Sequence, residues 1–145
     1  MRRHVIWATA GILIVLYIVL LKSWPVINVV ETGRTPEYPD VQPRQYSASR
    51  AQVFDAALHA VNRLPRWALV SYQAETGEIR AEATTLVLRF VDDVAIRVME
   101  QGSGTVVSVR SSSRVGRSDF GQNARNIRAF LAELDLQLER ASTHS

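Results

Sequence analysis

The chain of 145 residues is long enough for one compact domain plus an additional segment, because domains commonly contain about 100–150 residues. It contains no cysteine, which excludes a disulfide framework, a thiolate metal site and a cysteine nucleophile. The net charge of +3 comes from Arg2, Arg3 and Lys22, since the 14 other basic residues and all 14 acidic residues follow Lys22. The remainder of the chain is therefore neutral overall, and no nucleic-acid partner is expected.

An uncharged apolar segment runs from residue 5 to residue 21. As a helix it would extend about 26 Å, which is the short end of the range for a membrane-spanning helix. Trp7 and Trp24 lie near its two ends, where amphipathic rings settle at headgroup level. We expect a membrane anchor over residues 1–22, with the lipid bilayer as its partner through residues 5–21. A cleaved signal peptide and a buried core helix are the alternatives, but no small-residue cleavage site follows the segment.

The charges that flank this segment predict its orientation. Arg2 and Arg3 precede it, whereas Lys22 and the more distant Arg34 follow it. The positive-inside rule therefore favours a cytoplasmic N-terminus and a single pass through the cell membrane. The rest of the chain would then be extracytoplasmic, in the periplasm if the cell has one.

Residues 23–45 contain Pro36, Pro39 and Pro43 among polar residues, and this spacing favours extended backbone over helix. We interpret the segment as a stalk. A single α+β domain is then expected over residues 46–140, followed by a tail at residues 141–145.

The domain begins with a predicted helix. Ser49 and Gln52 form a capping-box pattern at its start, and apolar residues at helical spacing continue to Leu64. Pro65 follows directly and is expected to end the helix.

Two predicted β-hairpins follow. Residues 67–72 and 79–83 flank a turn signal at Glu75-Thr76-Gly77, and alternating stretches at 94–99 and 105–111 flank a second one at Gly102-Ser103-Gly104. Between the hairpins, the apolar stretch at residues 86–91 either prolongs the second strand or forms a strand of its own. The sheet would accordingly contain four strands, or five.

The last element is predicted as a helix because its apolar residues step by three and four positions. These are Phe120, Ala124, Ile127, Leu131, Leu134 and Leu138. Ser118 or Asp119 is the expected N-cap. The order of helix, strands and helix predicts an α+β fold: an N-terminal transmembrane helix, then an antiparallel sheet with helices packed on one face.

Asp92 and Asp93 are the paired carboxylates from which a catalytic hypothesis would start. Adjacent residues of a strand project to opposite faces of the sheet, so the two could not flank one bond as acid and base without a bulge or turn. Turn formation and pairing with arginine are their simpler roles.

Residues 110–128 are locally basic. The arginines are Arg110, Arg114, Arg117, Arg125 and Arg128, and Asp119 is the acidic residue among them. With hydroxyl and backbone donors from Ser111 to Ser113, Gly116 and the start of the helix, where Ser118 lies, this region is a candidate site for an anion. Alternatively, the arginines pair with Asp92, Asp93 and the acidic residues of the first hairpin.

Asn123 falls about 60° from the centre of the apolar stripe on a helical wheel, so it is expected to be partly buried and to bond to the preceding loop. Arg125 points away from the stripe and is expected to face solvent or a partner. Arg128 lies on the flank, where its stem is expected to cover the sheet edge.

The sequence predicts no metal, cofactor or catalytic residues. His4, His59 and His144 lack the spacing of metal ligands, and no nucleophile elbow, P-loop or dinucleotide-binding fingerprint occurs.

The run from Arg110 to Phe130, together with Phe90 to Val94, resembles the uncharacterised bacterial family called domain of unknown function 1499. The residues that match its signature are Arg110, Ser111, Ser113, Arg114, Gly116, Ser118, Asp119, Gly121, Asn123 and Ile127. Asn126 departs from the arginine that many members have, and Pro39 to Ser49 stands where many have a cysteine-containing segment. The resemblance covers roughly Tyr46 to Leu138 and implies a shared fold and loop, with no activity to transfer.

We therefore expect a membrane-anchored envelope protein that is a non-catalytic binding module. Its loop at residues 110–128 would bind an envelope protein or an anionic lipid or glycan group. An enzyme acting on an envelope substrate through Asp92, Asp93, Asp119 and these arginines is the alternative, and a lipid carrier would require an apolar cavity under the sheet.

Overall fold

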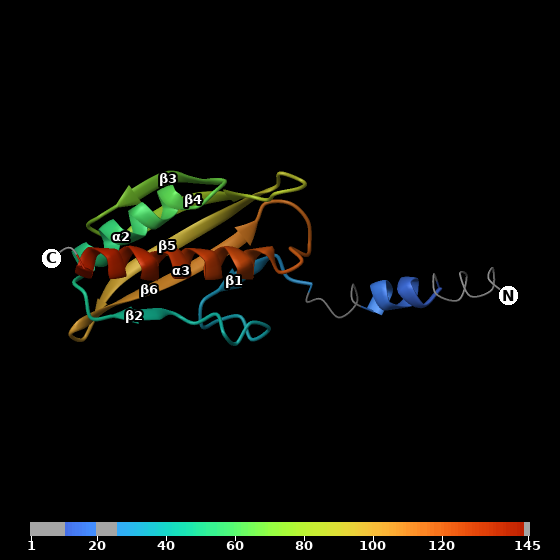
Figure 1. The fold of residues 1–145 in the computed structure, drawn as a ribbon, viewed down its shortest axis with the longest axis horizontal. Helices are drawn as coiled ribbons and strands as arrows, with labels where there is room; N and C mark the ends of the chain where they lie inside the picture. Colours follow the sequence, from blue (N-terminus) through green and yellow to red (C-terminus); the bar gives the residue numbers. More distant parts are fainter. Residues whose placement is uncertain (1–10, 20–25, 144–145) are drawn as a thin grey trace.

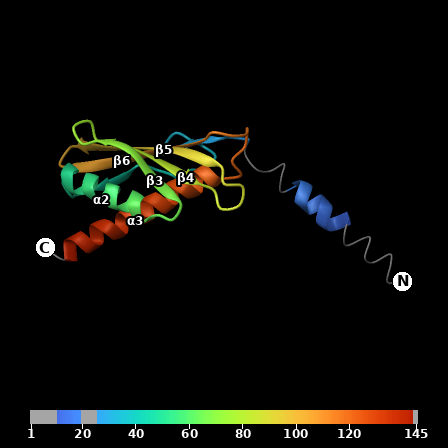
Figure 2. The same cartoon turned by 90° about the horizontal axis from the view of Figure 1, so that it is seen from above.

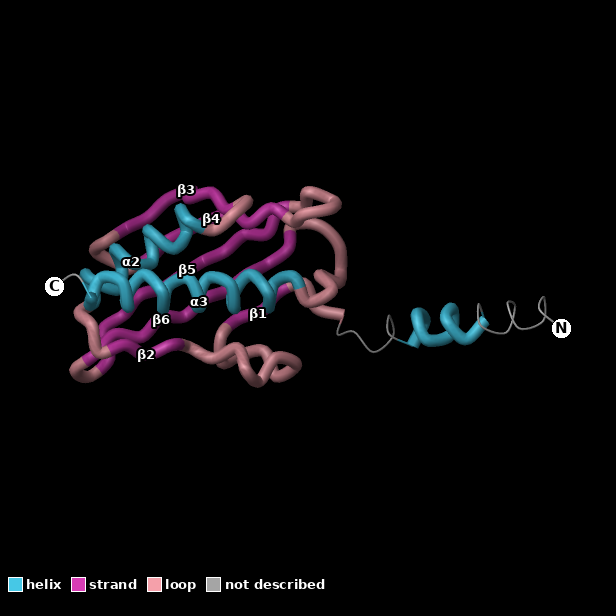
Figure 3. Tube along the Cα trace, viewed as in Figure 1, coloured by secondary structure: helices cyan, strands magenta, loops and turns pink. Residues whose placement is uncertain are grey.

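The computed structural model describes residues 11–19 and 26–143 of the chain. From residue 26 onward it contains six strands and two long helices (Figures 1 and 3). In chain order these are β1 (Val29–Glu31), β2 (Arg44–Tyr46), α2 (Arg50–Arg63), β3 (Trp67–Gln73), β4 (Glu78–Thr84), β5 (Val91–Gln101), β6 (Gly104–Ser113) and α3 (Gln122–Thr143).

The six strands form one antiparallel sheet. Four of them follow the order β6-β5-β4-β3, with β3 at one edge. At the other edge β6 pairs with two short strands, β1 along residues 110–112 and β2 along residues 105–107. The long β5–β6 hairpin is therefore the centre of the sheet.

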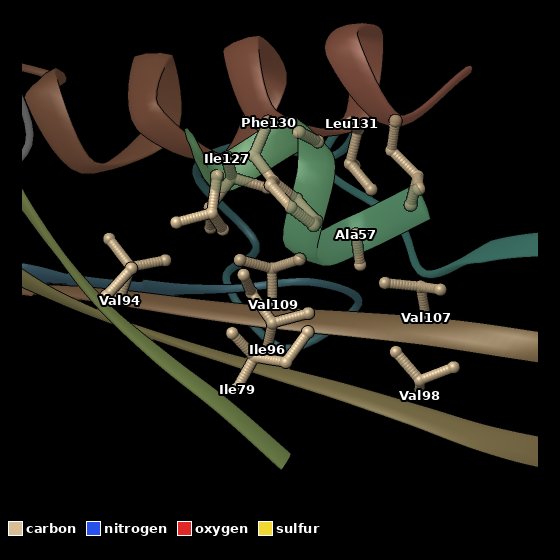
Figure 4. Packing of buried hydrophobic residues seen from close by; sticks show 14 of the residues in the cluster. Ala57, Ile79, Val94, Ile96, Val98, Val107, Val109, Ile127, Phe130 and Leu131 are labelled. Carbon is tan, nitrogen blue, oxygen red and sulfur yellow. The ribbon is translucent and has the colours of Figure 1, made fainter. Parts of the chain in front are cut away.

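Both helices pack on one face of the sheet, as the view in Figure 2 shows. The alternation of buried and exposed residues along β4, β5 and β6 provides the apolar face that they cover. In Figure 4, Ile127, Phe130 and Leu131 of α3 point toward Ile96 and Val109 of the sheet. The ring of Phe130 also stacks on Trp67 of β3, with ring centroids 6.2 Å apart. The core lies between the sheet and the two helices.

The predictions for the first helix and the two hairpins are confirmed. Ser49 caps α2 through a capping box with Gln52, and the helix ends at Arg63, shortly before Pro65. The hairpins β3–β4 and β5–β6 occur where the turn signals predict them.

The expected membrane-spanning helix is not found in the described part of the chain. Residues 11–19 of the expected anchor are described, and they are helical. Residues 1–10 and 20–22 lie outside the described residues. Within residues 11–19 and 26–143 no helix combines the length and the apolarity that crossing a membrane requires. The described fold is α+β without a membrane-spanning helix.

The number of strands also differs from the expectation. Residues 29–31 and 44–46, within and next to the expected stalk, pair with β6, so the sheet has six strands rather than four or five. Val30 and Val41 are buried in the core, which explains why this proline-containing segment is held against the domain.

The apolar stretch at residues 86–91 and the start of α3 also differ from expectation. Residues 85–90 form a loop closed by Thr85, whose backbone N–H donates to Phe90 O and whose hydroxyl accepts from Phe90 N. Phe120 and Gly121 both have positive φ angles, of 50° and 77°, which a right-handed helix does not allow. Helix α3 therefore begins at Gln122, and Phe120 is exposed rather than part of the buried stripe.

Candidate functional site

A cluster of buried polar side chains lies where β5 and β6 meet the first turns of α3. We call it the polar layer, and its members are Asp92, Ser111, Ser113, Asn123 and Asn126. Asp92 continues the inward-facing series of β5, and Ser111 and Ser113 continue that of β6. Asp92, Ser111, Asn123 and Asn126 are each less than 5% exposed. Burial of this kind is tolerated only where the polar atoms find partners.

Asn123 is the centre of the polar layer and, as its place on the helix predicts, it is buried. Its Oδ1 accepts a hydrogen bond from Ser111 Oγ at 2.6 Å. Its Nδ2 donates to Ser113 Oγ and to the backbone carbonyl of Asn28, both at 2.9 Å. One amide thus joins α3, the end of β6 and the segment that precedes β1.

Asn126 joins the polar layer to β5. Its Nδ2 donates to Asp92 Oδ2 at 2.8 Å and to Ser111 Oγ at 3.2 Å, while its Oδ1 accepts from Gln122 Nε2 at 2.8 Å. The sequence analysis missed this role. The signal was available, since Asn126 lies three residues after Asn123 and positions three apart share a face of a helix.

Burial raises the pKa of Asp92 above its ordinary value of 3.8. The hydrogen bonds from Ser113 and Asn126 oppose this rise, and the nearby carboxylates of Asp119 and Asp93 add to it. The folded state therefore holds a proton on Asp92 more tightly than the unfolded chain does.

This shift predicts a pH dependence of stability. Above the ordinary pKa of 3.8 the folded state binds more protons than the unfolded state, so the contribution of Asp92 falls as pH rises through its raised folded-state pKa. Asp92→Asn should remove this slope, and its stability relative to the wild type should increase from about pH 4 upward. Urea unfolding at a series of pH values measures the difference, and a constant difference across the series would contradict the prediction.

Asp93 provides the matched control, because it points to the other face of the sheet. Arg114 donates from Nε to both of its carboxylate oxygens, at 3.0 and 3.1 Å, and also pairs with Glu82. The Arg114 guanidinium holds the pKa of Asp93 below 3.8. Asp93→Asn should therefore shift the pH profile with the opposite sign, losing stability above the ordinary pKa.

The loop at residues 113–121 is held by Asp119. Its carboxylate accepts from the backbone N–H of Gly121 at 2.9 Å and of Asn123 at 2.7 Å, which caps the first turn of α3. Its own N–H donates to Ile27 O, and Asn28 Nδ2 donates to Gly116 O. The loop is thereby tied both to α3 and to the chain that enters β1.

A cleft of about 810 Å³ lies between this loop and the loop at residues 85–90. Asp92 and Ser113 of the polar layer line it together with polar and apolar residues of the two loops, and most of the lining surface is apolar. Six large apolar residues of the two loops are between 42% and 83% exposed: Leu86, Val87, Leu88, Phe90, Val115 and Phe120. The sequence did not lead us to predict this cleft. The signal was three consecutive apolar residues, Leu86-Val87-Leu88, which do not alternate with polar residues as in a half-buried strand.

The arginines of residues 110–128 fall into two groups. Arg117 and Arg125 line the cleft, together with Ser118 and Asp119. Arg125 donates to Phe120 O and Gln122 Oε1, both neutral oxygens, and no ion pair of Arg117 occurs among residues 11–19 and 26–143. Both guanidinium groups therefore keep an uncompensated charge beside the cleft.

The remaining candidates lie elsewhere. Arg128 makes a two-pronged bond to Asp40, at 2.7 and 2.9 Å, and its guanidinium covers the ring of Tyr38. Arg110 is exposed and stands opposite Glu31 in the sheet register. Arg114 and Asp93 are paired on the outer face of the sheet. These four residues do not contribute to the cleft.

Another hollow, of about 570 Å³, lies between β2 and the end of α3. Three of its polar side chains are already paired with one another, because Asp135 accepts from both Tyr46 Oη and Arg44. In the part of the chain that the structure describes, no group of histidine and carboxylate side chains is placed to hold a metal ion. The cleft is therefore the better candidate for a site.

No curated protein is significantly similar to the chain in sequence. Solved structures that are similar to it at low identity include TTHA0849 from Thermus thermophilus (12% identity, TM-score 0.43, 79% of this chain and 99% of that chain). They also include CalU16 from Micromonospora echinospora (14%, 0.39, 70% and 76%) and CV1439 from Chromobacterium violaceum (11%, 0.36, 77% and 94%). Residues 21–134, most of the chain, match the family model described as protein of unknown function (DUF1499), and the chain belongs to that family.

Proposed function

We propose that the domain is a non-catalytic binding module whose cleft receives an anionic amphiphile. The apolar body of the ligand would lie between the loops at residues 85–90 and 113–121, and its anionic group would meet Arg117 and Arg125. The observation that carries the proposal is the cleft itself, which is mainly apolar and has two uncompensated arginines in its lining. The proposal does not depend on a membrane-spanning anchor or on the expected extracytoplasmic location.

The exposed apolar side chains of the two loops support an apolar ligand. Leu86, Val87 and Leu88 are each at least 67% exposed. Covering one such side chain completely contributes about 1.5–3 kcal/mol, so a ligand that covers even two of them gains substantial free energy. A cluster of this size on a small domain is typical of a binding surface.

The charges of the loops support an anionic ligand. Arg89 and Arg117 are their basic residues without an ion pair among the described residues, Arg114 is paired with Asp93 and Glu82, and Asp119 is their acidic residue. Asp119 is buried and already accepts two backbone hydrogen bonds. An anionic group would therefore meet guanidinium donors without an opposing exposed carboxylate from either loop.

The alternatives receive less support. Asp92 and Asp93 face opposite sides of the sheet and Asp93 is paired with Arg114, so the two do not share one site as an acid and base would. A lipid carrier with its cavity under the sheet meets another obstacle, because side chains of the core fill the space between the sheet and the helices (Figure 4). The cleft lies at the end of the sheet instead.

Calorimetric titration of the full-length protein with dodecanoate, and with dodecanol as the uncharged counterpart, tests the proposal. We expect dodecanoate to bind more tightly than dodecanol. Leu88→Asp should weaken dodecanoate binding about tenfold or more, because the loss of one apolar contact and the added carboxylate both oppose it. Arg117→Gln should reduce the preference for dodecanoate and leave dodecanol binding unchanged.

Val70→Asp is the matched control, since Val70 is an exposed apolar residue of β3 outside the cleft. It should bind dodecanoate as the wild type does. Equal dodecanoate affinity in Leu88→Asp and wild type would overturn the cleft as the site. Equal affinity of the wild type for dodecanoate and dodecanol would overturn the anionic part of the proposal.

A further inference from the structure

The two loops that border the cleft project from the end of the domain at which the N-terminal part of the chain enters. Figures 1 and 2 both place the β4–β5 loop, the β6–α3 loop and the entry to β1 at the same end. Hydrogen bonds account for this arrangement, since Ile27 O accepts from Asp119 N at 3.0 Å and Asn28 Nδ2 donates to Gly116 O at 3.0 Å. The opposite end carries the β5–β6 turn, about 33 Å away along the length of β5.

Most of the large exposed apolar residues of the described domain gather at this end. Val26 and the six apolar residues of the two loops belong to it, whereas Val70, Tyr72, Met99 and Leu136 lie elsewhere. One of these exposed residues, Phe120, has an energetically unfavourable backbone conformation. Phe120 has a φ of 50°, in the left-handed region that bulky residues avoid, and its ring is nevertheless exposed.

The charged residues around these apolar tips are basic. Arg89 lies within the first loop and Arg117 within the second, both exposed and without an ion pair among residues 11–19 and 26–143. Asp119 is buried, and Asp93 and Glu82 both pair with the guanidinium of Arg114. Aliphatic and aromatic tips flanked by arginine are the composition of segments that enter the interface of an anionic bilayer.

The chain itself indicates which partner covers this end. Residues 5–21 are uncharged and apolar, and only a few residues separate them from Ile27 and Asn28, which are bonded to the second loop. A lipid surface that received this segment would lie within reach of the loop tips. We infer that the loops at residues 85–90 and 113–121 dock on the surface of an anionic lipid bilayer, with the cleft opening toward the lipid. This inference is independent of which ligand the cleft binds.

Site-directed labelling tests the inference cleanly, because the chain contains no cysteine. Val87→Cys, at the tip of the first loop, and Ser103→Cys, in the β5–β6 turn at the far end, each introduce one thiol for a nitroxide label. The full-length protein is reconstituted into vesicles of equal amounts of phosphatidylcholine and phosphatidylglycerol. Collisions of the nitroxide with oxygen, which concentrates in lipid, are then compared with collisions with a water-soluble nickel complex.

We expect the label at position 87 to collide mainly with oxygen and the label at position 103 mainly with the nickel complex. Adding Leu88→Asp to the Val87→Cys protein should return its label to water while the protein stays on the vesicles. Arg89→Gln together with Arg117→Gln should do so in part, and vesicles of phosphatidylcholine alone should mimic that effect.

A label at position 87 that remains as accessible to nickel as the label at position 103 would overturn the inference. Shielding of position 87 in the absence of vesicles, or shielding that depends on protein concentration, would also overturn it and identify a second copy of the chain as the occupant. Dodecanoate titration measures ligand binding in the cleft, whereas the nitroxide label measures contact with the bilayer. The failure of one proposal can therefore be told apart from the failure of the other.

Discussion

Asn123→Ala is expected to lower the free energy of unfolding by about 1–3 kcal/mol, because it leaves the buried hydroxyl of Ser111 without its acceptor. Asn28 O loses one donor but keeps the N–H of Ser113 at 2.8 Å. The loss should therefore come mainly from Ser111 and from the space that the amide vacates. Urea unfolding of the full-length protein measures it.

Two further variants separate this explanation from a general effect of substitutions in α3. Arg125→Ala alters an exposed side chain of the same helix and should change stability by less than about 0.5 kcal/mol. The double variant Ser111→Ala and Asn123→Ala should be more stable than the sum of the single effects predicts, since it removes donor and acceptor together. Equal melting temperatures for Asn123→Ala and the wild type would disprove the role of the amide.

Asp119→Ala is expected to lower the free energy of unfolding by about 1–2 kcal/mol, because the N–H groups of Gly121 and Asn123 lose their acceptor at the start of α3. The consequences should be local as well. Without its cap the loop at residues 113–121 loses its tie to the helix, so the wall of the cleft should become mobile. Amide hydrogen exchange should accelerate at residues 121 and 123 more than in β5.

Asp119→Asn is the matched control, since an asparagine oxygen also caps helices well. It should retain most of the stability and the slow exchange. If Asp119→Ala exchanges at Gly121 and Asn123 no faster than the wild type, the carboxylate does not hold the loop.

The sequence alone predicted the elements that have a repeating or chemically specific local signal. The capping-box pair Ser49 and Gln52 predicted the start of α2, and glycine-containing turns predicted the positions of both hairpins. Apolar residues spaced three and four positions apart predicted α3. The same local rules predicted a buried Asn123 and opposite faces for Asp92 and Asp93. Each of these depends on neighbours along the chain.

Elements without such a signal were not predictable. Strands β1 and β2 contain three residues each, too few to show alternation, and they exist because β6 offers them an unpaired edge. Phe120 fits the helical spacing of α3. However, the Asp119 carboxylate accepts from the N–H of Gly121, and Phe120 and Gly121 both have positive φ angles. The apolarity of residues 5–21 predicted a spanning helix that the described residues do not contain.

The local sequence thus determined which residues of each element turn inward, because side-chain direction repeats with the geometry of helix and strand. Only the tertiary structure decided how those residues meet. Asp92 and Asn126 are 34 positions apart in the chain, and the sheet register together with the packing of α3 brings them into hydrogen-bond contact. The cleft arises in the same way, since two loops from different parts of the sequence become its walls only when β5 and β6 pair and α3 packs against them.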